Sequence, residues 1–313
     1  MFIKKDTRKV PEIIADDADP RETMLLGRRG AEFIHGIGVL CHEKNIPRLS
    51  SLQTLSLYAN ELKSIDGIQT LQHSTQLVEL NVGCNQLTDL PSELSTLTSL
   101  ERLWVDDNRL TSMPTCVLEL SFLTVLRMSN NNIEFIPNEF HRLPSLEVLA
   151  VDNNMLSEVP SSIYDLKDLE KLLVRGNNIT TLSKDIAKLK KLKFFQASSN
   201  QIQIIPDELG SLTQLSTCLL NSNIIVDVPP ALSGLVALKK MSLANNRIVE
   251  LPGVLEELWQ LDGSLDEGVE PTVVVELHGN PLKGFNVLED GVEDGKESMD
   301  IEEETSNKRQ KVP

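Results

Sequence analysis

The chain has 313 residues, a formal net charge of −16 at pH 7, and only 4% aromatic residues. The acidic balance argues against nucleic-acid binding as the main task, since phosphate recognition needs clustered lysine and arginine. The sequence has no apolar stretch of about 18 residues, the least that a membrane-spanning helix requires, so we expect no membrane partner.

The first 20 residues are charged and lack the apolar core of a secretory signal, so residues 1–20 are predicted to be a mobile segment. The four cysteines (Cys41, Cys84, Cys116 and Cys218) lie far apart, which is unlike a disulfide framework. These two features predict an intracellular protein, cytoplasmic, with a nuclear location as the alternative.

A pattern of the form L-x-x-L-x-L-x-x-N-x-L recurs ten times along the chain. From Asn85 to Asn246 successive asparagines are 23 residues apart. In the L-x-L part both apolar side chains point to the same side of a short strand, because side chains alternate between faces. We expect the asparagines to turn the chain inward and to form a ladder that satisfies backbone groups left open by the turn. The ten asparagines are Asn60, Asn85, Asn108, Asn131, Asn154, Asn177, Asn200, Asn223, Asn246 and Asn280.

The second half of most repeats contains an apolar residue, a proline and further apolar residues three positions apart, as in Leu90-Pro91 with Leu94 and Leu97. This spacing predicts a short helical or 3₁₀ turn. Such turns are wider than strands, so the stack must curve with its strands on the concave side. The predicted fold is therefore an α/β solenoid, a leucine-rich repeat horseshoe with a parallel sheet on the concave face and short helical or 3₁₀ turns on the convex face.

The repeat pattern also predicts the boundaries of the chain's parts. Residues 21–51 form an N-terminal cap with one degenerate repeat, in which Met24-Leu25-Leu26 stands for L-x-L. Nine repeats occupy residues 52–261. The step from Asn246 to Asn280 is longer and places an acidic insert loop at 262–271, followed by a final repeat or C-terminal cap at 272–288. Residues 289–313 are predicted to be a disordered acidic tail with a basic end.

The basic end of the tail, Lys308-Arg309-Gln310-Lys311, matches a minimal nuclear-import pattern through Lys308, Arg309 and Lys311. The alternative is a basic terminus that merely balances the acidic tail.

Catalytic sequence motifs such as a phosphate loop or H-E-x-x-H do not occur in the sequence. The metal-ligand types between His35 and Glu43 match no zinc spacing. We therefore expect no enzyme activity, no metal and no cofactor.

The variable positions of the strands identify a candidate binding face, because these side chains point to the concave side. Aligned across repeats, they place apolar and aromatic residues in one solvent-exposed band with charged residues at its edge, which is typical of a protein-interaction site. Two alternatives remain open: Trp104 could simply stack on Arg127, and Asp152 could form a cross-strand ion pair with Arg175. The predicted partner-binding residues are Trp104, Asp106, Val125, Arg127, Val148, Asp152, Leu173, Arg175, Phe194 and Leu219.

The 23-residue frame with its L-P turns resembles the intracellular leucine-rich repeat family that includes the Ras-binding scaffold proteins and their plant relatives. The resemblance implies a non-catalytic scaffold or regulatory adaptor in intracellular signalling that binds a small GTPase, phosphatase or kinase, and we expect a monomer. A nuclear regulator that uses the acidic tail is the main alternative. A phosphatase-regulatory subunit is less favoured, because only one turn, Ile65-Asp66-Gly67-Ile68, resembles that type. An enzyme or ligand sensor would need a polar pocket that these positions do not supply.

Overall fold

A computed structural model describes residues 23–25, 51–66, 68, 71, 74–259 and 273–283, all in the unit Met1–Lys283. The predicted mobile segment, the insert loop, the tail with Lys308, Arg309 and Lys311, and most of the N-terminal cap lie outside the described residues. The same is true of residues 284–288 in the final repeat.

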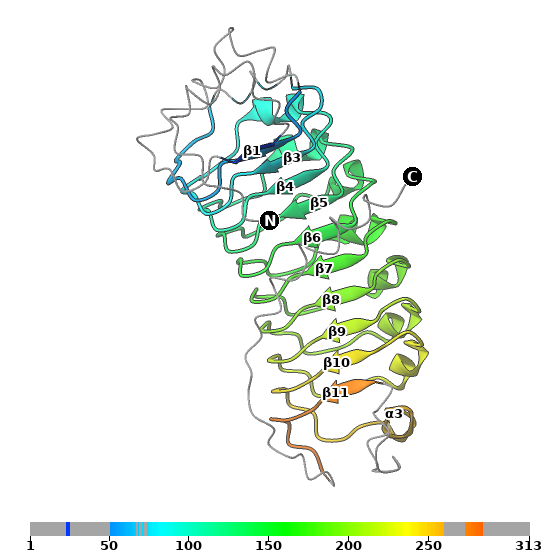
Figure 1. Cartoon of the computed structure of the whole chain (residues 1–313). Helices are drawn as coiled ribbons and strands as arrows, with labels where there is room; N and C mark the ends of the chain where they lie inside the picture. Colours follow the sequence, from blue (N-terminus) through cyan, green and yellow to red (C-terminus); the bar gives the residue numbers. More distant parts are fainter. Residues whose placement is uncertain are drawn as a thin grey trace. The chain divides into compact units, whose positions relative to one another are not determined.

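The described residues contain one parallel sheet whose eleven strands follow each other in sequence order (Figure 1). Each strand has three residues, and from β2 to β10 the middle residue is buried in the core while the two outer residues face the concave side. The strands are β1 (Thr23–Leu25), β2 (Thr54–Ser56), β3 (Glu79–Asn81), β4 (Arg102–Trp104), β5 (Val125–Arg127), β6 (Val148–Ala150), β7 (Lys171–Leu173), β8 (Phe194–Gln196), β9 (Thr217–Leu219), β10 (Lys240–Ser242) and β11 (Val274–Glu276).

The register of the sheet agrees with the repeat alignment made from the sequence. In the degenerate repeat Met24 pairs with Leu55, as the assignment of its L-x-L motif predicts. Further along, Trp104 pairs with Arg127 and Leu173 with Gln196, so residues one repeat apart lie side by side. In the parallel sheet, equivalent positions of successive repeats therefore lie next to each other.

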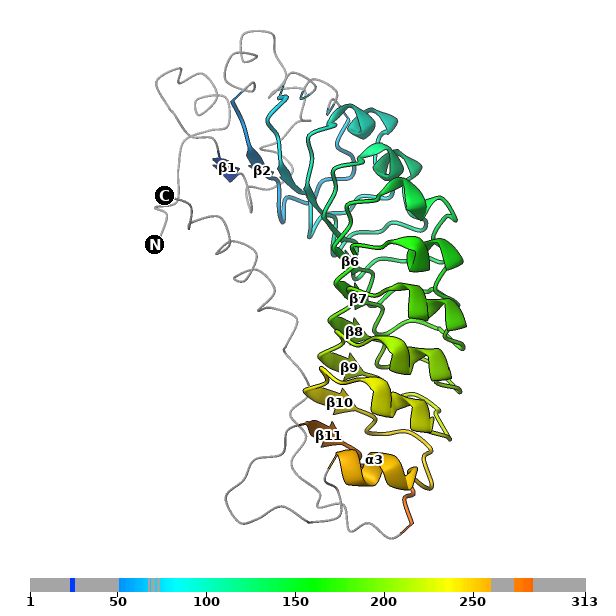
Figure 2. The ribbon, with the colours of Figure 1, turned by 90° about the vertical axis from the view of Figure 1, so that its right-hand side faces the viewer.

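Short turns lie on the side of the stack opposite the strands, as Figure 2 shows. Most are 3₁₀ helices that begin directly after the proline that recurs at the same position of the repeat, and the fixed φ of proline suits this position. Where Ser183 replaces proline, its side-chain oxygen accepts a hydrogen bond from the Asp185 N–H at 3.2 Å and caps the turn instead. The turns are η5 (Ser92–Thr96), η6 (Thr115–Glu119), η7 (Phe140–Arg142), η8 (Ser161–Asp165), η9 (Lys184–Lys188), η10 (Asp207–Ser211), η11 (Pro230–Gly234) and the α-helix α3 (Gly253–Leu258). The predicted solenoid horseshoe is confirmed.

The core is a continuous column of leucine, isoleucine and valine between the strands and the turns. The few large aromatic side chains in it, Phe140, Tyr164, Phe195 and Trp259, are at most 2% exposed. Because every repeat adds the same apolar positions, each one covers its neighbour and the core has no size limit of the globular kind.

The predicted asparagine ladder is present, and its hydrogen bonds can be followed at Asn131. The side-chain oxygen of Asn131 accepts the N–H of Leu110 in the preceding repeat at 3.0 Å. Its amide nitrogen donates to the carbonyls of Val105 at 3.1 Å and Met128 at 3.0 Å. Each asparagine thus links two repeats through backbone groups that have left the sheet.

The position directly before each ladder asparagine adopts a left-handed conformation, which the repeat pattern did not reveal. Examples are Cys84 with a φ of 52°, Asp107 with 55° and Gly176 with 64°. Asparagine, aspartate and glycine tolerate this region better than other residues. The preference for small polar residues at this position was the sequence feature from which the turn could have been predicted.

Candidate functional site

The structure places the ten predicted binding residues on strands β4–β9 and directly after them, on the concave side of the sheet. We call this set the central band: Trp104, Asp106, Val125, Arg127, Val148, Asp152, Leu173, Arg175, Phe194 and Leu219. Strand pairing puts Trp104 beside Arg127 and Val125 beside Val148, so members on neighbouring strands lie side by side in this part of the sheet.

The expectation that the aliphatic members of the band are exposed is wrong. Val125 is 9% exposed, Val148 5%, Leu173 3% and Leu219 7%. Adjacent strands lie only about 4.8 Å apart, so each of these short side chains lies close between its strand neighbours, as Val125 does between Arg102 and Val148. Trp104 and Phe194 remain partly exposed. The apolar contact area open to a partner is therefore concentrated in the two aromatic side chains, and we call the four buried aliphatic residues on β5, β6, β7 and β9 the floor of the band.

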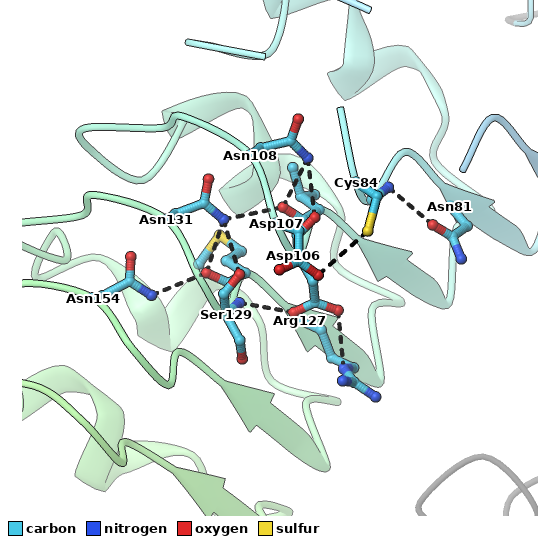
Figure 3. A network of polar contacts seen from close by, with 12 residues as sticks. Asn81, Cys84, Asp106, Asp107, Asn108, Arg127, Ser129, Asn131 and Asn154 are labelled. Atoms are coloured by element: carbon cyan, nitrogen blue, oxygen red, sulfur yellow. Dashed lines mark hydrogen bonds and ion pairs between the residues drawn. The ribbon is translucent and has the colours of Figure 1, made fainter. Parts of the chain in front are cut away.

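The two acidic members of the band hydrogen-bond to main-chain groups of the next repeat. The Asp106 carboxylate accepts the Ser129 N–H at 2.8 Å, and the Asp152 carboxylate accepts the Arg175 N–H at 2.7 Å. Figure 3 shows the Asp106 contacts, which include the Nε of Arg127 at 3.1 Å. Both aspartates thus satisfy N–H groups just beyond the strand ends, where the chain leaves the ladder.

These contacts bear on the two alternative interpretations. The Nε of Arg127 lies 3.1 Å from the Asp106 carboxylate, so Arg127 has an acidic partner in addition to its strand neighbour Trp104. Between Asp152 and Arg175 the observed bond is to the main-chain N–H, which any residue at position 175 other than proline could donate. The Arg175 side chain is therefore not needed for that bond.

Burial makes the aspartates of the band hard to ionise. Removal from solvent raises the pKa of Asp106, while the charge of Arg127 and the Ser129 hydrogen bond act in the opposite direction. For Asp152 the same desolvation dominates over the hydrogen bond and charge of Arg175, and it raises the pKa to about 7. The Asp152 carboxyl therefore binds a proton more readily than an exposed aspartate does.

The charges of the band alternate along the sheet, one repeat at a time: Asp106, Arg127, Asp152 and Arg175. Beyond this series, Glu79 pairs with Arg102 across β3 and β4, and Lys240 with Glu276 at 3.6 Å across β10 and β11. The concave side therefore contains ion pairs near both ends, with the aspartate–arginine series between them.

Two of the cysteines in the described part, Cys116 and Cys218, are buried. Burial raises the pKa of Cys116 to about 11 and that of Cys218 to about 12, so these thiols stay protonated and unreactive at neutral pH. Among the described residues, histidine, cysteine and carboxylate side chains do not gather in any group of three that could hold a metal ion. Nor does this part of the chain contain a helix long and apolar enough to cross a membrane.

Together, the period, the parallel sheet and the asparagine ladder define a repeat solenoid with a concave strand face. Two family descriptions match it: "Leucine Rich repeats (2 copies)" over residues 50–96 and "Leucine rich repeat" over residues 98–156. The chain is a leucine-rich repeat protein, the class that the sequence period predicted.

Curated relatives share only part of the chain. Human volume-regulated anion channel subunit LRRC8E is 29% identical, and the mouse subunit 31% identical, over 33% of this chain. The match spans 15% of the length of either subunit, so it concerns the repeats and not the rest of those proteins.

Solved structures resemble the repeat stack over a longer range. A leucine-rich repeat protein of Leptospira interrogans is 28% identical with a TM-score of 0.61, and the similarity covers 78% of this chain and 64% of that one. The TDR receptor is 25% identical with a TM-score of 0.65, covering 76% of this chain and 41% of the receptor. The structure of PEPR1 with AtPEP1 is 26% identical with a TM-score of 0.62, covering 76% and 33%.

Proposed function

We propose that this protein is a non-catalytic scaffold or regulatory adaptor that binds a partner protein through the central band of its concave face. Leucine-rich repeats generally present curved surfaces for protein recognition. The solved PEPR1–AtPEP1 complex shows a similar repeat stack together with a second molecule. The observation that carries the proposal is the pair of partly exposed aromatic side chains, Trp104 and Phe194, on the same sheet face as the buried aliphatic floor of the band. Exposed aromatic residues of this kind commonly contribute most to the binding free energy of an interface.

We further propose that the protein acts inside the cell, in signalling, with a small GTPase, phosphatase or kinase as the class of partner. The absence of clustered cysteines from the sequence supports an intracellular setting. A nuclear role is the second possibility, supported by the basic residues Lys308, Arg309 and Lys311 at the end of the sequence.

The test is co-purification from native lysate with wild-type protein and single-residue variants. We expect Trp104→Ala and Phe194→Ala to lose a partner that the wild type retains. A matched control is Phe122→Ala, which removes an aromatic side chain that is 63% exposed but lies outside the strand rows, between η6 and β5. Circular dichroism must show that all variants fold like the wild type. Capture of the same proteins by all four forms would contradict binding through the concave face.

A further inference from the structure

The charge on the central strands differs from that of the chain as a whole. The protein has a formal charge of −16, yet on β4–β7 and the two residues after each strand the concave positions carry four basic and two acidic side chains. The basic residues are Arg102, Arg127, Lys171 and Arg175, and the acidic ones are Asp106 and Asp152. A local basic excess on an acidic protein favours approach of a negatively charged partner.

Two of these basic side chains keep hydrogen-bonding capacity for a partner. Arg127 contacts Asp106 through Nε, which leaves its two terminal nitrogens unengaged by any described residue. The Arg175 side chain likewise has no ion pair or hydrogen bond within the described part of the chain, since only its main-chain groups are used. Arg102, in contrast, already pairs with Glu79. Arg127 and Arg175 are therefore the two guanidiniums that can recognise an incoming group.

The neighbouring aspartates do not cancel this capacity. The carboxylate of each aspartate accepts a hydrogen bond from a main-chain N–H of the next repeat and therefore points along the sheet. Burial also disfavours the charged form of both. The carboxylates of the series from Asp106 to Arg175 are thus engaged with main-chain groups of the sheet.

We propose that the partner segment bound by the central band is acidic, and that Arg127 and Arg175 bind its carboxylates. This inference depends on the proposed function, because it specifies the chemistry of the same surface. A guanidinium forms paired, charge-assisted hydrogen bonds with a carboxylate, a geometry that lysine does not reproduce.

The spacing of the two arginines limits how the acidic residues can be arranged. Arg127 ends β5 and Arg175 follows β7, so they are two strands apart, about 10 Å across the sheet. An extended chain advances about 3.3 Å per residue, so two carboxylates two to four positions apart can reach both arginines. Trp104 on β4 and Phe194 on β8 lie on either side of this pair and would contact apolar residues flanking the acidic positions.

The experiment is selection of a random twelve-residue peptide library displayed on phage against the immobilised full-length protein. We expect selected peptides to be enriched in aspartate and glutamate with this spacing. Their affinity should fall at least tenfold in the Arg127→Gln/Arg175→Gln double variant. Arg142→Gln is the control, since Arg142 is an exposed arginine on the convex turn η7 that pairs with Glu119. If the double variant is unstable, Arg175→Gln alone removes a side chain without described partners and should still weaken binding.

The outcomes separate this inference from the proposed function. Selection of basic or uncharged peptides, or acidic peptides that bind the double variant as well as the wild type, would overturn the acidic partner. If those peptides are nevertheless lost with Trp104→Ala, the concave face remains the binding surface. If no peptide is selected and Trp104→Ala retains every partner in co-purification, both proposals fail.

Discussion

Replacement of Asn131 by alanine tests whether the asparagine ladder holds neighbouring repeats together. Asn131 is 6% exposed and lies in the middle of the array. Its side chain makes four hydrogen bonds, one accepted from the Leu110 N–H and three donated to carbonyls. Alanine removes all four and leaves no polar atom to replace them.

The magnitude follows from what each partner retains after the change. The Val105 carbonyl keeps its bond from Asn108 at 3.1 Å, and the Met128 carbonyl keeps its bond from Asn154 at 3.0 Å. The carbonyl of Ser129 keeps the Asp107 N–H at 2.9 Å. Only the Leu110 N–H loses its single described acceptor. A buried donor without a partner costs about 1–3 kcal/mol, and the weakened carbonyl bonds add to this, so we expect a loss of about 2–4 kcal/mol in the free energy of unfolding.

Urea unfolding followed by circular dichroism measures the global effect, and hydrogen exchange at the Leu110 amide measures the local one. The control is Asn132→Ala, because Asn132 is exposed and its main-chain bond to the Leu110 carbonyl survives the substitution. We expect the control to change stability by less than about 0.5 kcal/mol. Equal stability of the two variants, with unchanged exchange at Leu110, would refute the structural role of the ladder.

Three other substitutions test separate features. Leu173→Glu should destabilise the protein by about 3 kcal/mol or more in urea unfolding, because it puts a carboxylate at a position that is 3% exposed; unchanged stability would contradict the burial of the band's floor. Gly176→Ala should lower stability by about 1–2 kcal/mol, because its φ is 64° and an added Cβ would lie 2.2 Å from the Asn153 Oδ1, whereas Gly253→Ala, with open space around it, should not. For Asp152 the folded-state pKa of about 7 exceeds its ordinary value of 3.8, so the folded protein holds the extra proton between these values and stability falls as pH rises through this window. Asp152→Asn keeps an acceptor for the Arg175 N–H and should flatten that part of the wild-type stability–pH curve, and an identical curve would show that Asp152 titrates normally.

The fold could be predicted from the sequence because the repeat period sets the register of the parallel sheet. A 23-residue step from Asn85 to Asn246 places each residue beside its counterpart in the next repeat. Alternation of side chains then decides which positions face the core, and so the rows of the concave face also follow. Even the weak motif Met24-Leu25-Leu26 paired with β2 in the expected register.

The exposure of side chains within those rows could not be predicted in the same way. Leu173 and Phe194 occupy variable positions on adjacent strands, yet Leu173 is buried and Phe194 is partly exposed. Exposure depends on the length of the neighbouring side chains and on the curvature of the sheet, and neither is part of a repeat frame. The bonds from Asp106 and Asp152 to main-chain N–H groups were missed for a related reason, since a carboxylate on a variable position suggests a surface charge.

The 23-residue period also brings basic side chains next to acidic side chains of the preceding repeat. The turn η9 and the segment between it and β8 contain a lysine-rich run that resembles a basic binding patch in the sequence. Three of its lysines pair with acids of the preceding repeat, each 23 residues earlier: Lys188 with Asp165 at 3.1 Å, Lys191 with Asp168 at 2.5 Å and Lys193 with Glu170 at 2.6 Å. Exposed pairs of this kind contribute little stability, but they neutralise these three lysines. On the concave side, Asp152 lies one repeat before Arg175 and feels its charge, but its carboxylate bonds to the Arg175 main-chain N–H and not to the guanidinium. The terminal nitrogens of Arg127 and the side chain of Arg175 thus make no hydrogen bond or ion pair with another described side chain, and we therefore expect a partner to bind these arginines and not the paired lysines.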